Sequence, residues 1–370
     1  MIQGLYIHIP FCLSICSYCD FVKLIGSESL QQDYMDSLIR ELRTNAHNLA
    51  AVRTIYIGGG TPSCLKPELL APLFRELAML PAFPAIEEYT IEANPGDIDF
   101  EMAMLFKRAG ITRVSLGVQT FSERLLEPLR RRGGYPLVMA TVANLRKAGI
   151  PRLNLDLIYG LPGQTDGDVR RDLESIRKIH PEHLSYYQLI LEEKTELAHL
   201  IRSGSVHLPD EDDVYRMGKL IEGRLESEGY QRYEISNYAL PGQKSRHNLL
   251  YWNLEEYLGI GMGAASQYAA KRFRNHDRIR AYLTAVQTHG SGLMQEEPFE
   301  PDRETLILGL RKLEGIDMLA FAKDYGKPVL EMFPKLRKHL AGKLLMIQGT
   351  RLCLTETGLD LMNQVLMALD

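Results

Sequence analysis

Residues 5–19, LYIHIPFCLSICSYC, join a strand-like run to three closely spaced cysteines. The run at 5–9 is largely apolar, and Cys12, Cys16 and Cys19 follow it in the pattern Cys-x3-Cys-x2-Cys. Three thiolates on one tight loop can hold three corners of an iron–sulfur cluster, which normally takes four cysteines. The fourth iron then lacks a protein ligand and can bind a small molecule, as the open position of a catalytic zinc does.

Two other interpretations of these cysteines stay open. A zinc ion with His8 as fourth ligand is one, although His8 belongs to the strand and not to the loop. Unrelated core cysteines are the other, although three cysteines seldom fall by chance within eight residues. Cys64 and Cys353 stand alone, and we expect both to be small buried residues. Five cysteines in 370 residues do not suggest a disulfide scaffold, so we expect a cytoplasmic protein.

Further strand-like runs follow the first, with helix-like stretches between them. These runs are TIYIG (54–58), EYTIEA (88–93), RVSLGV (113–118), RLNLDLIYG (152–160) and HLSYYQLIL (183–191). Most are near-continuously apolar, which is typical of parallel strands covered on both faces. Apolar residues at helical spacing occupy 30–49, and Gly149 is predicted to end another helix. The repeated alternation predicts an α/β fold with a parallel sheet, either open or closed into a barrel.

Polar residues follow the carboxyl ends of these runs. The stretch Gly58-Gly59-Gly60-Thr61 follows the second run, Glu92 lies near the end of the third, Gln119 follows the fourth, and Asp156 lies late in the fifth. In parallel sheets and barrels this edge carries the functional site. Taken one at a time, the same residues also fit ordinary turns and helix caps.

The organisation changes after about residue 235. We expect a core at 1–235, a segment at 236–300 that ends in a connection over 286–301, and a C-terminal domain at 301–370. The C-terminal domain is predicted to hold helices, a hairpin around Gly349-Thr350 and a last helix that begins near Thr355. This pattern predicts a winged-helix-like module. Its charge is nearly balanced, with 10 Lys+Arg against 9 Asp+Glu over 302–370, which favours a protein-facing role over DNA binding.

The composition excludes several classes of protein. Hydrophobic residues make up 45% and charged residues 24%, as in ordinary globular chains. The 43 Lys+Arg and 47 Asp+Glu give a net charge of −4, so we expect no nucleic-acid partner. No apolar run approaches the roughly 20 residues that span a bilayer, and the N-terminus lacks the pattern of a signal peptide. We therefore expect no stable membrane insertion.

The sequence YIHIPFCLSICSYC (6–19) resembles the opening of the radical S-adenosylmethionine (SAM) superfamily. Within it, the chain resembles the group of oxygen-independent coproporphyrinogen III oxidase and the HemW-type heme chaperones. Further matching motifs are GGGTPS (58–63), IEANPG (91–96), SLGVQTF (115–121) and DLIYGLPGQT (156–165). The resemblance implies a partial (β/α)6 barrel, a [4Fe–4S] cluster on Cys12, Cys16 and Cys19, and SAM on the open iron. In this family the reduced cluster cleaves a carbon–sulfur bond of SAM.

The resemblance also implies a set of SAM contacts. They are Tyr6, Gly59, Gly60, Thr61, Glu92, Gln119, Arg131 and Asp156. Glycines allow close approach of the backbone, carboxylates can accept from ribose hydroxyls or the amino group, and arginine offers a rigid donor fork. For Arg131 a second interpretation stays open, because the run Arg130-Arg131-Arg132 is also typical of a solvated face. No residue is predicted to be catalytic.

Two features favour the heme chaperones over the oxidase within this group. The oxidase pattern has a further cysteine where this chain has Phe21 and a longer segment before the first strand, whereas five residues precede Tyr6 here. The stretch His247-Asn-Leu-Leu-Tyr251-Trp252 matches an HNxxYW motif of the chaperones. By this resemblance His247 ligates heme iron, and Tyr251 and Trp252 lie against the macrocycle. A His beside aromatic residues is also a common core arrangement.

The predicted function is heme binding and transfer to an acceptor protein, with a [4Fe–4S] cluster, SAM and heme as cofactors. The alternative is an oxygen-independent coproporphyrinogen III oxidase, so the sequence leaves open whether the chain is an enzyme. A zinc-bearing regulatory module is a third class. Related sequences commonly have His at the position of Ala265, which weakens the prediction of the heme site. A respiratory-chain acceptor and a homodimer also stay open.

Overall fold

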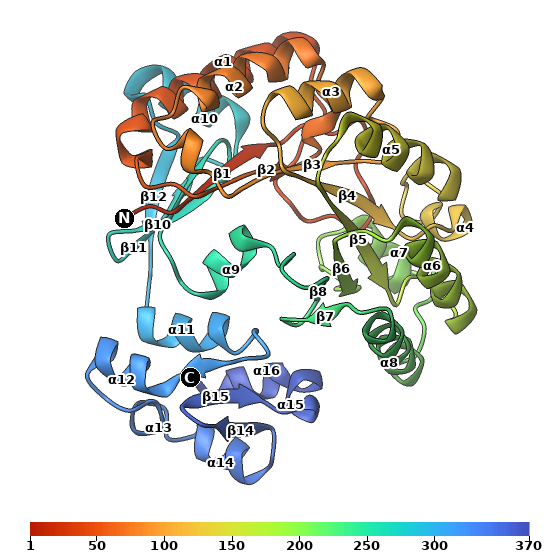
Figure 1. Cartoon of the computed structure of the whole chain (residues 1–370), viewed down its shortest axis with the longest axis vertical. Helices are drawn as coiled ribbons and strands as arrows, with labels where there is room; N and C mark the ends of the chain where they lie inside the picture. The colour runs from red at the N-terminus through yellow and green to blue at the C-terminus, as the bar shows by residue number, and fades with distance from the viewer. Residues whose placement is uncertain (370) are drawn as a thin grey trace.

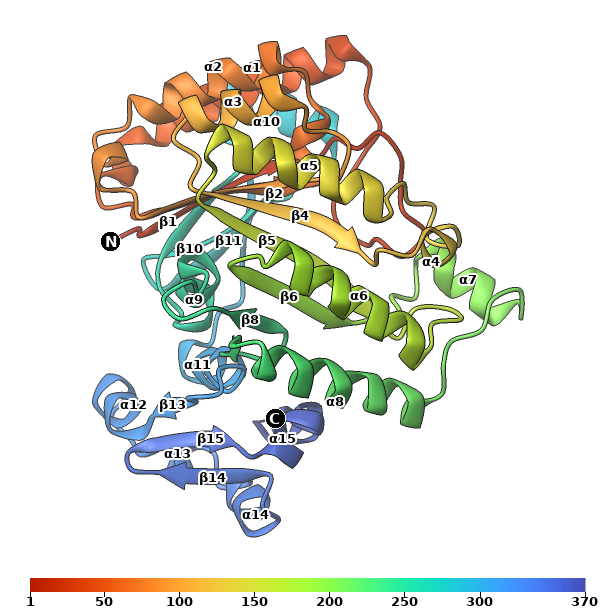
Figure 2. The same cartoon turned by 45° about the vertical axis from the view of Figure 1, so that its right-hand side comes forward.

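The computed structural model describes residues 1–369 and centres on one curved, twelve-stranded sheet (Figures 1 and 2). Its parallel strands are β1 (Gly4–Ile9), β2 (Thr54–Gly59), β3 (Glu88–Ala93), β4 (Arg113–Gln119), β5 (Arg152–Tyr159), β6 (His183–Gln188) and β9 (Tyr257–Ile260). The antiparallel strands are β7 (Gln231–Arg232), β8 (Asn237–Ala239), β10 (Ala265–Tyr268), β11 (Lys271–Asn275) and β12 (Leu293–Glu297).

The strand order is β12-β11-β10-β9-β1-β2-β3-β4-β5-β6-β8-β7. The predicted α/β fold is confirmed, since all six strand-like runs form neighbouring parallel strands. The sheet bends into an arch but does not close, because β12 and β7 lie at its two edges (Figure 1). The architecture is therefore the predicted partial barrel, extended at both edges by antiparallel strands.

Helices cover the convex face of the arch (Figure 1). They are α1 (Glu28–Asn45), α2 (Pro67–Ala78), α3 (Phe100–Arg108), α5 (Tyr135–Ala148), α6 (Asp166–Ile179) and α10 (Ile279–His289), with α8 (Glu211–Ser227) beside α6. Ser27 caps α1, whose predicted continuation to residue 49 is a 3-10 turn, η1 (Ala46–Leu49). Gly149 ends α5 at φ 79°, as predicted. The remaining short elements of the core are η2 (Pro62–Cys64), η3 (Phe83–Ala85), α4 (Glu123–Leu126) and α7 (Glu196–Arg202).

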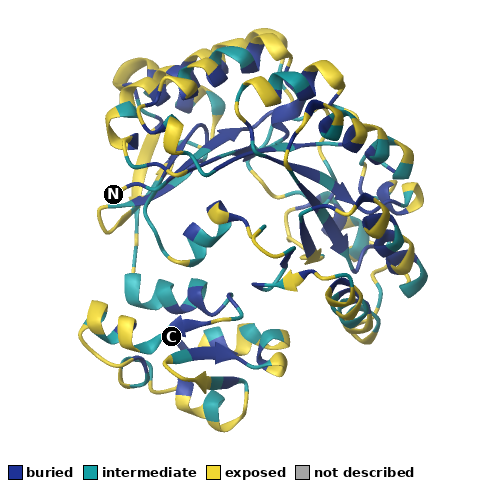
Figure 3. Ribbon diagram, in the orientation of Figure 1, coloured by how far each residue is buried: buried dark blue, intermediate teal, exposed yellow. Residues whose placement is uncertain are grey.

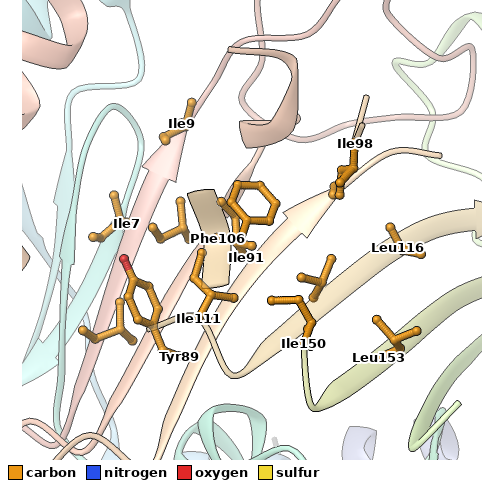
Figure 4. Close-up of a cluster of buried hydrophobic side chains, with 14 of the residues drawn as sticks. Ile7, Ile9, Tyr89, Ile91, Ile98, Phe106, Ile111, Leu116, Ile150 and Leu153 are labelled. Carbon is orange, nitrogen blue, oxygen red and sulfur yellow. The ribbon is translucent and has the colours of Figure 1, made fainter. Parts of the chain in front are cut away.

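Alternate residues of each parallel strand point to opposite faces of the sheet. Figure 4 shows Ile7, Ile91, Leu116 and Leu153 packed with Phe106 of α3 in the core under the helices. The residues between these apolar positions are largely polar. The apolar positions of the strands therefore gather on one face of the sheet. Both faces are covered (Figure 3), but one packs on helices and the other carries polar side chains that bond to one another.

Helix α9 (Arg246–Trp252) closes the concave side of the arch at the amino ends of the strands (Figure 1). The carboxylate of Glu88 on β3 accepts hydrogen bonds from Ser245 Oγ at 3.1 Å and from the backbone amides of Arg246 and His247 at 3.1 and 3.0 Å. Glu88 is fully buried. These bonds satisfy amides that a helix start leaves unpaired, so they fix α9 against the sheet.

The sheet continues well beyond residue 235, because β8 to β12 all belong to it. The segment 286–301 is not only the predicted connection: it contains the end of α10 and the edge strand β12, which pairs with β11. Four of the five residues of β12 are exposed, so its composition resembles that of a loop. The division of the chain near residues 235 and 300 stays a prediction.

The C-terminal part forms a smaller unit with its own apolar core and a sheet of order β13-β15-β14. Its elements are α11 (Pro301–Gly309), β13 (Ile316–Asp317), α12 (Met318–Tyr325), α13 (Val329–Met332), α14 (Leu336–Ala341), β14 (Leu345–Gln348), β15 (Arg351–Leu354), α15 (Glu356–Asp360), α16 (Met362–Leu366) and η4 (Met367–Leu369). The predicted hairpin is present as β14 and β15. Thr355 caps α15 by accepting from the Gly358 amide at 3.0 Å. No helix within residues 1–369 has the length and apolar character needed to cross a bilayer.

A buried carboxylate on α1 ties distant segments of the core together. Glu41 accepts hydrogen bonds from the amides of Gly261 and Gly292 at 2.8 and 2.7 Å, from Tyr282 OH at 2.8 Å and from Asn275 Nδ2 at 3.0 Å. Burial raises the pKa of Glu41, and these four donors oppose that shift. One side chain therefore holds the turn after β9 and the segment before β12 against α1.

We expect Glu41→Leu to lower the free energy of unfolding by about 3 kcal/mol, because four buried donors lose their acceptor. The measurement is urea unfolding followed by circular dichroism. Asp33→Leu is the matched control, since Asp33 is an exposed carboxylate on the same helix, and its effect should stay within about 0.5 kcal/mol. Equal stability of the two variants would contradict the role given to Glu41.

Candidate functional site

A cavity of about 1000 Å³ lies at the carboxyl ends of the parallel strands. All three thiols of the cysteine loop line it. Seven of the eight predicted SAM contacts line it as well: Gly59, Gly60, Thr61, Glu92, Gln119, Arg131 and Asp156. Tyr6 is the exception, because it is not among the lining residues and its hydroxyl lies 2.9 Å from His8 Nδ1. Residues from four strands and from the loops after β1, β2 and α4 thus converge on one space.

The cysteine loop lies between β1 and α1 and is closed at its base by backbone hydrogen bonds. The Cys12 amide donates to Leu24 O at 3.0 Å, and the Leu24 amide donates to Pro10 O at 2.8 Å. Burial raises the pKa of Cys12 and of Cys19. The closed base directs the residues between 12 and 24 toward the cavity.

The three thiols line one shared cavity but are not gathered into a site for a single metal ion. Within residues 1–369, no three His, Cys, Asp or Glu side chains are gathered closely enough to hold one ion. In a cluster each thiolate binds its own iron, so three thiols around a shared space suffice. His8 does not line the cavity, and its Nε2 lies 2.8 Å from Val22 O. The zinc interpretation with His8 therefore finds no support in this geometry.

The glycine run at the end of β2 allows segments of the chain to pack closely against each other. A Cβ on Gly58 would lie 2.8 Å from the Glu92 carboxylate, and one on Gly60 would lie 2.6 Å from Phe11 O. Gly59 has φ 117°, a conformation that favours glycine, and a Cβ there would meet the His8 ring at 2.6 Å. The run therefore lets the cavity wall and the cysteine loop pack against β2.

Glu92 is a half-buried acceptor in the cavity wall. Its Oε1 accepts from Tyr56 OH at 2.7 Å, and its Oε2 accepts from the Gly59 amide at 3.1 Å. Burial raises the pKa of Glu92 to about 7, and the nearby charge of Asp156 adds to the shift. Near neutral pH this carboxyl can therefore hold or release a proton.

Asp156 forms a second acceptor in the same wall. It accepts from Ser115 Oγ at 2.8 Å and from Asn154 Nδ2 at 2.7 Å. Burial raises its pKa as well. Gln119 lies nearby at a bulge in β4, with φ 66°, a conformation uncommon for a residue with a side chain.

Arg131 points into the site, whereas its neighbours Arg130 and Arg132 are exposed. Its Nη1 lies 3.5 Å from Cys16 Sγ, and its Nη2 donates to Asn94 Oδ1 at 2.6 Å and to Gly117 O. Its Nε is buried and has no partner within residues 1–369. The charge run is thus not a uniform solvated face. A cation beside one thiol and an unsatisfied donor fit a site that takes an anionic cluster and a polar ligand.

The predicted heme residues lie apart from the thiols. His247, Tyr251 and Trp252 belong to α9 and do not line the cavity. His247 is fully buried, with Nδ1 at 2.8 Å from Thr54 Oγ1 and Nε2 at 2.8 Å from Tyr251 OH. Burial lowers the pKa of His247 to about 3. The Arg311 guanidinium lies over the Trp252 ring, with its Cζ 4.8 Å from the ring centroid. Both nitrogens of His247 are occupied by hydrogen bonds in this structure.

Residues 6–176 match the model of the radical SAM superfamily, and residues 300–361 match the HemN C-terminal domain. The chain is 38% identical over 371 residues to heme chaperone HemW of Lactococcus lactis, covering 97% of this chain and 95% of that protein. It is 35% identical over 373 residues to heme chaperone HemW of Bacillus subtilis, covering 98% of each. The chain belongs to the HemW family of radical SAM proteins.

A solved structure supports the same fold. The radical SAM enzyme coproporphyrinogen III oxidase (HemN) of Escherichia coli superposes with a TM-score of 0.86 at 23% identity, covering 100% of this chain and 90% of that chain. At this identity the match shows the fold of this HemW family member and not its activity. The two matches cover 97% and 98% of this chain and 95% and 98% of the HemW relatives. The family assignment therefore applies to the whole chain.

The sequence patterns did not predict several residues that line or support this site. Tyr56 and Asn94 contact Glu92 and Arg131, and both stand inside or beside the matching motifs. Leu13, Phe21 and Ile190 are exposed apolar residues that line the cavity. For Leu13 and Phe21 the available signal was that large apolar residues stand beside the cysteines in the sequence.

We expect Gly60→Ala to reduce cluster loading by about half or more, because the added Cβ meets backbone atoms of residues 10 and 11 that lead into the cysteine loop. Iron, acid-labile sulfide and absorbance after anaerobic reconstitution measure the loading. Gly223→Ala is the matched control, since nothing lies within 4 Å of a Cβ there. Full loading of Gly60→Ala would show that the loop adapts.

Proposed function

We propose that this chain binds heme and passes it to an acceptor protein, and that its cavity holds a [4Fe–4S] cluster and SAM. The similarity to proteins named heme chaperone HemW over 97–98% of the chain carries the proposal. The apolar rim of the cavity supports it. When bound, the cluster supplies an electron to SAM.

The rim of the cavity exposes a cluster of apolar side chains, which is uncommon on a solvent-exposed surface. Leu13, Phe21 and Ile190 are 69%, 73% and 74% exposed, and all three line the cavity. Exposed apolar groups of this kind mark binding sites. Heme is a flat apolar macrocycle with two carboxylates, and the exposed Arg132 on the same rim has no ion-pair partner within residues 1–369. The rim therefore suits one edge and one face of heme.

The residues of the wall would act on the cluster and SAM in distinct ways. Arg131 offers positive charge beside Cys16, and Thr61 Oγ1 lies 3.8 Å from Cys12 Sγ. Glu92 and Asp156 offer acceptors for hydroxyl or ammonium groups of SAM. Both carboxylates are half-buried, so they face the cavity from a partly desolvated wall.

The assignment of the heme ligand to His247 stays a prediction. The imidazole is neutral, as iron ligation requires, but it must first leave Thr54 and Tyr251 and become accessible. Heme contact with the rim requires no such rearrangement. The two sites can therefore be tested separately.

We expect the cluster-loaded protein to bind about one heme per chain in an anaerobic titration followed by absorbance. Phe21→Ser should weaken heme binding roughly tenfold, because it removes apolar contact area at the rim. Met79→Ser is the matched control, as Met79 is 76% exposed and does not line the cavity. His247→Ala should alter the heme spectrum if His247 is the ligand. An unchanged spectrum would remove His247 from the heme site.

Absence of saturable heme binding would overturn the proposal and favour the oxidase alternative. The next assay would then be decarboxylation of coproporphyrinogen III with SAM and a reductant. A vinyl-bearing product would assign the oxidase activity to this chain. Phe21, at the position of the oxidase cysteine, argues against that outcome.

We also expect SAM affinity to depend on the protonation of Glu92. Its carboxylate form, which accepts hydrogen bonds, prevails above a pKa of about 7, so affinity should fall roughly tenfold from pH 8 to pH 6. Tyr56 OH, the Gly59 amide and Asp156 are the groups that face it. Calorimetric titration of cluster-loaded protein measures this dependence. Glu92→Gln should bind more weakly and with a flat pH profile, whereas an unchanged profile would assign the titration to another group.

A further inference from the structure

Tyr56 on β2 touches both the cavity wall and the helix that carries the HNxxYW motif. Its hydroxyl donates to Glu92 Oε1 at 2.7 Å. Its ring stacks on the His247 ring, with 5.2 Å between centroids and 28° between planes. One side chain therefore links a ligand-facing carboxylate to α9.

The Glu92 carboxylate depends strongly on this contact. Its two hydrogen-bond partners within residues 1–369 are Tyr56 OH and the Gly59 amide. Gly58 lies so close that a Cβ there would touch the carboxylate, so the carboxyl packs directly against the β2 backbone. Loss of the Tyr56 hydroxyl would leave one oxygen without a partner and free the carboxyl to turn.

His247 is held rigidly on the other side of Tyr56. Thr54 and Tyr251 bond its two ring nitrogens, and Glu88 accepts from its backbone amide. The Tyr251 ring packs edge-on against it, with centroids 4.9 Å apart. His247 itself does not line the cavity. Any influence of His247 on a ligand in the cavity must therefore pass through a neighbour, and Tyr56 is the neighbour that touches the wall.

We infer that Tyr56 is a positioning residue for SAM, which orients Glu92, and that His247 is a second positioning residue, which acts through Tyr56. In this chain the HNxxYW motif then supports the SAM site from the amino ends of the strands. The inference rests on the proposed binding of SAM and is independent of heme delivery.

SAM affinity of cluster-loaded variants, measured by calorimetry, tests this inference. Tyr56→Phe keeps the stacked ring and loses one hydrogen bond to a charged group, so we expect affinity to fall about tenfold. His247→Ala removes the stacking partner and should weaken SAM about threefold or more, whereas His247→Phe, which restores a ring, should recover most of the loss. Thr54→Val offers a milder test of the same route if His247→Ala folds poorly.

The double variant Tyr56→Phe, His247→Ala separates a shared route from two independent effects. We expect it to bind SAM about as weakly as Tyr56→Phe alone, because both changes act on Glu92 through one contact. Tyr89→Phe is the matched control: Tyr89 is buried on the convex side and its hydroxyl has no partner within residues 1–369. Its affinity should equal that of the wild type.

Three results would overturn the inference. Tyr56→Phe could bind SAM like the wild type, His247→Ala could leave SAM affinity unchanged, or the two effects could multiply in the double variant. Failure of the wild type to bind SAM would overturn the cofactor assignment and this inference together. The heme titration of the same protein would still decide heme binding separately.

Discussion

Polar side chains near the amino ends of the parallel strands are covered by protein on the concave face, and most of them bond to partners there. Glu88 does so by capping α9. His183 on β6 does so with Asn154 at 2.6 Å and Tyr233 OH at 2.7 Å. A buried polar group without a partner costs about 1–3 kcal/mol, so these bonds decide which segments can cover the concave face. The position of α9 follows from them.

The same face changes character along the strands. Near the amino ends, polar groups bond to one another and to the segment from Tyr233 to His247. Near the carboxyl ends, Glu92, Asp156 and Arg131 border an open cavity, and Arg131 keeps a donor unused. Many polar groups at the base are thus bonded within the protein, although Thr90 Oγ1 on β3 has no partner within residues 1–369, and the mouth leaves capacity for ligands. Tyr56 lies where the two regions meet.

Much of this arrangement could be predicted from the sequence, because it follows from local patterns. The strand runs and the polar residues at their ends indicated the edge of the sheet that carries the cavity, and the family resemblance named seven of the residues that line it. The sequence left a core position for His247 open beside heme ligation, since its partner Thr54 is far away in the sequence. The polar character of the concave face could not be predicted, because near-continuous apolar runs hide a period of two. The rim residues escaped notice because exposure of Phe21 and Ile190 is a property of the folded surface.

The place of β1 in the sheet has a consequence for biosynthesis. β1 pairs with β2 on one side and with β9 on the other, so Gly4 to Ile7 lie beside Tyr257 to Ile260. One edge of the first strand therefore stays open until more than two-thirds of the chain has left the ribosome. The cysteine loop directly follows this strand. The frame around the thiols is thus completed late in translation, and an unpaired edge is exposed beside reactive sulfur until then.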